Sequence, residues 1–214
     1  MTVAATSEKY TRQANRYLLY TILGLAAGII TRLSDFFPYD SLWSFSSIAT
    51  LFGFWIVTVT LVIYFSDSNC NAAINVLLYL LNMNLSFYLL QYILGFYMPR
   101  FFNDGFQWNL FMFYNVLAVV CSVISFVLYN WNKENKWSSF LYALPVSGLA
   151  AETIGVGIYL SEHQMYLFQF VFNLTGLVVL GGLFFRNAAN KSVFAVTLAT
   201  ITATMFSLFY FPFL

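Results

Sequence analysis

The sequence contains few charged residues. Only 8% of its 214 residues are Asp, Glu, Lys or Arg, and the formal net charge is +1. Proteins that bind nucleic acid neutralise phosphates with a stripe of basic residues. No such stripe is present, so we expect no nucleic-acid partner. Hydrophobic residues make up 61% of the chain, well above a soluble globular domain, which indicates a protein embedded in a lipid bilayer.

Residues typical of catalytic centres are also scarce. The single histidine, His163, excludes an HExxH site or a histidine cluster. Cys70 and Cys121 have no CxxC spacing and are most simply small apolar side chains. No GxSxG, Walker A or GxGxxG motif occurs in a supporting context. We therefore expect no metal, no cofactor and no enzymatic activity.

Long apolar segments occupy most of the chain. A helix needs about 20 apolar residues to cross ~30 Å of hydrocarbon. Seven segments approach this length, at 17–37, 47–65, 72–97, 108–130, 138–160, 164–185 and 191–212. The predicted fold is an all-α polytopic membrane protein, with a cytoplasmic N-terminal tail at 1–16 and a single transmembrane helical domain at 17–214. Seven transmembrane helices are expected, and six, with one segment re-entrant, are the alternative.

Basic residues predict the orientation, because cytoplasmic loops carry an excess of Lys and Arg. With the N-terminus in the cytoplasm, only Arg32 and Arg100 lie on the opposite side. The cytoplasmic set is Lys9, Arg12, Arg16, Lys133, Lys136, Arg186 and Lys191. Seven spans then place the C-terminus outside. We expect a multi-pass protein of the plasma membrane.

Glu152 lies well inside the segment 138–160. A carboxylate at the bilayer centre costs about 3 kcal/mol on insertion scales, so such residues usually face protein or a water-filled cavity. Gly148 and Gly155 share its helical face, at four residues before and three after. Small residues let neighbouring helices approach closely. We therefore predict that several helices pack around Glu152.

Other polar side chains lie at similar depths, in the outer halves of their segments. They are Arg32, Gln91, Asn115, Gln169 and Asn173. With Glu152 they form the predicted ligand-binding set of a pocket open to the outside. The simpler interpretation of the amides is interhelical hydrogen bonding, worth ~0.6 kcal/mol each.

Arg32 and Glu152 differ in predicted depth by roughly 5 Å, at 1.5 Å per residue. A snorkelling arginine side chain spans that difference. The two residues form a structural ion pair in one interpretation. In another, Glu152 serves a ligand or a proton, and in a third Arg32 reaches the outer headgroups.

Gly24 and Gly28 form a GxxxG motif in the first segment. The motif predicts close helix contact, within the bundle or with a partner membrane subunit. In layout the chain resembles the substrate-capture components of energy-coupling factor vitamin transporters, which have similar length, no ATPase of their own, an outward pocket and such a motif for docking. Those proteins usually have one span fewer, and no other motif is shared. The resemblance concerns architecture.

These features predict a small-solute transporter or substrate-capture subunit with an outward-facing pocket around Glu152. The expected ligand is a small, largely apolar or zwitterionic solute. The alternative is a non-catalytic membrane scaffold or accessory subunit of a larger complex, whose buried polar groups only specify helix packing.

Seven spans require the two termini to lie on opposite sides of the membrane. We expect an epitope tag before Met1 to bind antibody only after cells are permeabilised, and a tag after Leu214 to bind it in intact cells. Two tags that respond alike would favour the six-span alternative.

Overall fold

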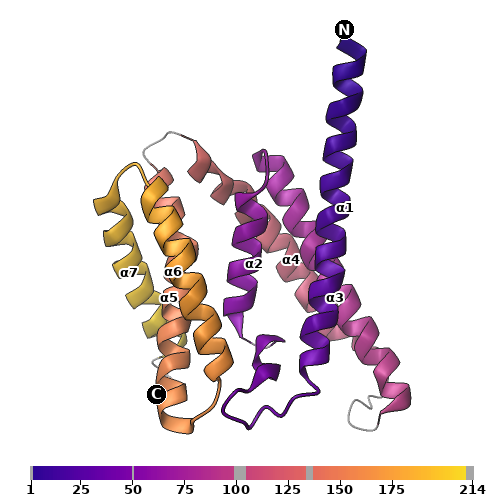
Figure 1. The fold of residues 1–214 in the computed structure, drawn as a ribbon, viewed down its shortest axis with the longest axis vertical. Helices are drawn as coiled ribbons and strands as arrows, with labels where there is room; N and C mark the ends of the chain where they lie inside the picture. Colours follow the sequence, from indigo (N-terminus) through magenta and orange to yellow (C-terminus); the bar gives the residue numbers. More distant parts are fainter. Residues whose placement is uncertain (1, 50, 99–104, 134–136, 211–214) are drawn as a thin grey trace. The chain divides into compact units, whose positions relative to one another are not determined.

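The computed structural model describes residues 2–49, 51–98, 105–133 and 137–210. Within these residues the chain forms seven α-helices and no strand (Figure 1). The helices are α1 Thr2–Ser34, α2 Phe52–Tyr64, α3 Asn69–Tyr97, α4 Trp108–Leu128, α5 Ser138–His163, α6 Leu167–Asn187 and α7 Lys191–Phe209. The short 3-10 helices η1 Phe45–Ala49 and η3 Tyr129–Asn132 precede α2 and follow α4. The predicted all-α helical bundle is confirmed.

Six helices in the described part of the chain are long and apolar enough to cross a bilayer. The exception is α2, whose 13 residues extend about 20 Å at 1.5 Å per residue, against ~30 Å of hydrocarbon. The predicted span 47–65 therefore contains a shorter apolar helix that follows η1. At the N-terminal end of the chain, α1 begins at Thr2, so residues 2–16 of the expected tail are part of the first helix. The chain is a multi-pass helical membrane protein, and its orientation stays a prediction.

The helices group into two compact units. The first comprises Met1–Leu33 and Val62–Val127, which contain α3, α4 and nearly all of α1. The second comprises Ser34–Leu61 and Leu128–Leu214, with η1, most of α2, η3, α5, α6 and α7.

In the first unit α1 packs closely on α3. A side chain at Gly24 would collide with the backbone carbonyl of Tyr79, and one at Gly28 with the backbone carbonyl of Met83 and the hydroxyl of Ser86. Hydrogen atoms at both positions let the two backbones approach. Because α3 of the same chain occupies this face, the predicted docking of a partner subunit through Gly24 and Gly28 finds no support here.

In the second unit α5 is the central helix, because α6 and α7 both pack along it (Figure 1). Its buried positions include Ala143, Ser147 and Ala151, whose small side chains allow close packing. Pro145 lies inside α5 without ending it. The packing of α6 and α7 on this helix leaves Glu152 buried within the unit.

Gly28→Val should destabilise the protein, because the branched side chain meets the rigid backbone of α3. Overpacking of this kind costs about 1–3 kcal/mol. We expect the melting temperature in detergent to fall by several degrees. Gly182→Val is the matched control, since a side chain at Gly182 meets no atom within 4 Å. Equal melting temperatures of the two variants would contradict the close α1–α3 contact.

Candidate functional site

Glu152 connects three helices of the second unit. Its side chain lies on α5 and only 2% of the residue is exposed. Oε1 accepts a hydrogen bond from the backbone N–H of Phe52, with an N···O distance of 3.0 Å. Oε2 accepts one from the hydroxyl of Tyr210, the residue that follows α7. Phe52 begins α2, so its N–H has no acceptor within that helix, and the positive end of the helix dipole faces the carboxylate.

Gly155 makes the contact with Tyr210 sterically feasible. A side chain at Gly155 would collide with the Tyr210 ring, so the ring lies directly against the backbone of α5. The ring also stacks on Phe206 of α7, with centroids 6.0 Å apart and planes at 15°. Tyr210 is therefore held by packing as well as by its hydrogen bond to Glu152.

A cavity of about 510 Å³ lies beside Glu152. Its described lining residues come from the second unit and are Leu51, Phe52, Ile56, Gly148, Ala151, Glu152, Met205, Phe209 and Tyr210. Among them only Glu152 and Tyr210 carry polar side-chain atoms. Phe52 and Phe209 are 66% and 62% exposed, whereas Ala151 and Glu152 are buried, so the two phenylalanine rings form the rim. Apolar walls with few polar groups are typical of small-molecule sites.

Gly148 keeps this cavity open on the α5 side. A Cβ atom built there would lie 3.5 Å from Ile56 Cδ1 and 3.9 Å from Met205 Sδ. These are ordinary van der Waals distances, so a Cβ atom at Gly148 would fit without a collision. The space beside Gly148 that a side chain would fill is part of the cavity. The predicted face of Gly148, Glu152 and Gly155 is thus the face of α5 that meets α2 and the C-terminal end of α7.

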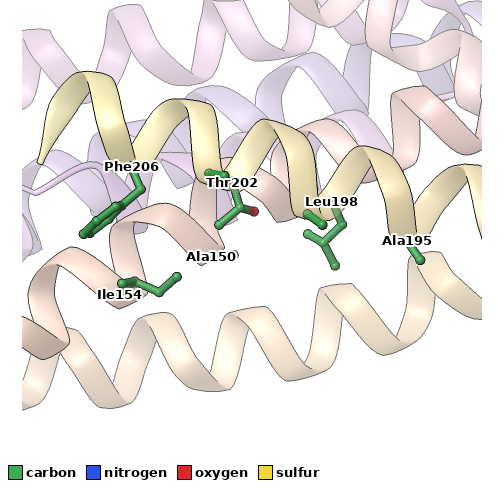
Figure 2. Close-up of a pocket in the computed structure, with 8 residues that line it drawn as sticks. Ala150, Ile154, Ala195, Leu198, Thr202 and Phe206 are labelled. Carbon is green, nitrogen blue, oxygen red and sulfur yellow. The ribbon is translucent and has the colours of Figure 1, made fainter. Parts of the chain in front are cut away.

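A second depression of about 440 Å³ lies between α5 and α7 (Figure 2). It is lined by Ala150, Ile154, Ala195, Leu198, Ala199, Thr202, Ala203 and Phe206. The hydroxyl of Thr202 donates a hydrogen bond to the backbone carbonyl of Ser147, with an O···O distance of 3.3 Å. Because none of the lining residues that the structure describes is charged, this groove offers less to orient a ligand than the cavity beside Glu152.

Gln169 and Asn173 form a buried amide pair on α6, and neither residue is exposed. Gln169 Nε2 donates a hydrogen bond to Asn173 Oδ1 at 2.7 Å. Gly53 of α2 lies against Asn173, because a side chain there would collide with the carboxamide. Gln169 Oε1 and Asn173 Nδ2 have no hydrogen-bond partner among the described residues. Both residues lie in the same unit as Glu152, but neither lines its cavity.

The other three predicted site residues belong to the first unit. The guanidinium carbon of Arg32 lies 5.2 Å from the ring centroid of Phe87, a cation–π distance. Asn115 of α4 accepts a hydrogen bond from Asn84 of α3 at 3.1 Å, which links the two helices. Gln91 is buried on α3. The predicted ion pair between Arg32 and the carboxylate on α5 joins residues of different units and stays a prediction.

Sequence reasoning did not single out Phe52, Met205, Phe209 or Tyr210. In a chain with 21% aromatic residues, a single ring in an apolar segment carries no distinguishing pattern. The one available signal was Gly155, since a glycine close to a buried acid on the same helical face leaves room for a ring beside it.

No protein-family model, curated protein or solved structure matches the chain. In the described residues, no group of three or more His, Cys, Asp or Glu is placed to hold a metal ion.

Gly53→Ala should destabilise the second unit, because the added methyl group meets the Asn173 carboxamide. Asn173→Ala removes that obstacle, so Gly53→Ala should lower the free energy of unfolding less in the Asn173→Ala variant than in the unaltered protein. We expect the two decreases to differ by about 1–3 kcal/mol. The measurement is denaturant-induced unfolding in micelles, arranged as a double-mutant cycle. The same cost in both backgrounds would show that the two residues do not touch.

Proposed function

We propose that this protein captures a small, largely apolar solute in the cavity beside Glu152, as a transporter or as the substrate-capture subunit of one. The supporting observation is the volume of the cavity, about 510 Å³. Small-molecule sites typically measure about 300–1,000 Å³, whereas a water molecule occupies only ~30 Å³. A gap that holds a single water molecule would instead have favoured a Glu152 that only stabilises the packing of the helices.

The bound solute would alter the contacts that hold the helices together. Glu152 accepts hydrogen bonds from Phe52 at the start of α2 and from Tyr210 after α7. A solute that binds the carboxylate competes with these donors, so occupancy of the cavity is coupled to the positions of both segments. A ligand shifts a conformational equilibrium only through such differential contacts. This coupling is what a capture or transport cycle requires.

We propose no catalytic step for this cavity. Glu152 and Tyr210, the two polar side chains among its described lining residues, are hydrogen-bonded to each other. General acid–base catalysis requires a group within hydrogen-bond reach of the reacting proton, and a nucleophile requires an adjacent activating base. A solute that is bound and released unchanged needs neither.

The alternative function is a membrane scaffold or accessory subunit without a ligand. It is favoured by the hydrogen bond between Glu152 and Phe52, which gives the buried acid a structural role at the start of α2. Under this alternative the cavity is a packing gap filled by lipid, and no small molecule binds it saturably.

Gly148→Val places a branched side chain in the cavity and should weaken solute binding. The neutral probe is radiolabelled cyclohexylmethanol, and binding is measured by equilibrium dialysis against nanodiscs with and without protein. We expect saturable binding to the unaltered protein and a loss of about tenfold or more in the variant, because the apolar contact area is lost.

Gly181→Val is the matched control for this experiment. Its nearest neighbour, Val146 Cγ1, lies 3.5 Å from the built Cβ, the same distance as at Gly148, and Gly181 lies outside the cavity. The control should bind the probe normally, and both variants should melt like the unaltered protein. Equal binding by both valine variants would favour the scaffold.

A further inference from the structure

We propose that the polar end of the captured solute is a protonated amine. This inference depends on the proposed capture function and adds the chemical class of the solute. The cation lies beside the carboxylate of Glu152, and the apolar part of the solute lies against Ile56 and Met205.

The described lining of the cavity carries a negative charge. Among the described lining residues Glu152 is the one acid, and none is Lys, Arg or His. The start of α2 contributes about half a positive charge, which leaves the carboxylate only partly compensated. An ionised carboxylate offers about four lone-pair sites. Phe52 and Tyr210 donate to two of them, and the backbone N–H of Gly53 is a third donor to this carboxylate. The site that remains suits a positively charged donor.

The lining of the cavity is also rich in aromatic side chains. Among its nine described residues, three are aromatic: Phe52, Phe209 and Tyr210. The face of an aromatic ring attracts a cation that lies within about 6 Å of its centroid, and the attraction strengthens when the cation leaves water. The Tyr210 ring is packed against Gly155 and Phe206. The rings that an ammonium group would meet are therefore those of Phe52 and Phe209 at the rim. A neutral solute lacks this cation–π attraction.

The same lining disfavours the other solute classes. An anion would meet the carboxylate, and charge repulsion is weakly screened in an apolar environment. A zwitterion needs a basic partner for its acid, and none of the described lining residues is basic. A solute with many hydroxyl groups would leave them unpaired against apolar walls, at a cost for each. An amphipathic amine avoids all three penalties.

The test compares two probes of nearly the same shape. Cyclohexylmethylamine carries a positive charge at neutral pH, and cyclohexylmethanol carries none. Both are measured by equilibrium dialysis with nanodiscs of zwitterionic lipid, with protein-free nanodiscs subtracted. Because charge-assisted hydrogen bonds are roughly twice as strong as neutral ones, we expect the amine to bind the unaltered protein about tenfold more tightly.

Two substitutions connect that preference to the site. Glu152→Gln keeps an oxygen that accepts from Phe52 but removes the charge, so the amine should lose its advantage while the alcohol still binds. Tyr210→Phe removes the hydroxyl that competes for Oε2, so it should preserve or raise the preference for the amine. Tyr210→Phe serves as the deciding variant if Glu152→Gln does not fold.

The outcomes separate the two proposals. Equal affinities of the unaltered protein for both probes, both weakened by Gly148→Val, would overturn the amine assignment and leave the capture function intact. An amine preference that survives Glu152→Gln, or that is lost in Tyr210→Phe, would also overturn the assignment. Absence of saturable binding of either probe would overturn the capture function itself.

Discussion

The hydrogen bond between Glu152 and the first N–H of α2 is the constraint on which the second unit depends. Hydrocarbon offers no water to a backbone N–H or to a carboxylate, and each is costly to bury alone. Here each group satisfies the other, since a helix start needs an acceptor and favours a negative charge. The acid can therefore remain inside an apolar helix without a basic partner in its own lining.

This contact also determines where the cavity lies. Because α2 begins at Phe52, beside the middle of α5, the space next to the carboxylate is bounded by the start of one helix and the end of another. Gly155 brings the Tyr210 ring onto α5, and Gly148 leaves the neighbouring turn empty. Two glycines on one face thus have opposite effects, since one admits a ring and the other preserves a void.

Much of the helical layout follows from hydropathy, because a bilayer demands long apolar helices. The predicted segment 108–130 corresponds to Trp108–Leu128, and 138–160 to Ser138–His163. The segment 47–65 was less accurate, since an apolar run does not reveal that η1 ends before α2 begins. The burial of Glu152 was predictable from its depth. Its partner Tyr210 was not, because the two residues are 58 positions apart and sequence depth does not specify which helices are neighbours.

The predicted site of six polar residues rests on depth alone. Arg32, Gln91 and Asn115 belong to a different compact unit from Glu152, so their sharing of one pocket stays a prediction. Within its own unit, Asn115 pairs with Asn84 on the adjacent helix. Equal depth is thus necessary for a shared site, and only the packing of the helices decides whether the residues meet.

The position of Tyr210 in the chain has a consequence for biogenesis. During synthesis from the N-terminus, Phe52 and Glu152 emerge first, and the phenol reaches the carboxylate only after α7 has been inserted. Until then one carboxylate oxygen lacks this donor within the nascent bundle. Insertion of α7 thereby completes the set of side-chain and backbone donors described for this carboxylate, and a chain truncated before α7 would leave Oε2 without the Tyr210 hydroxyl.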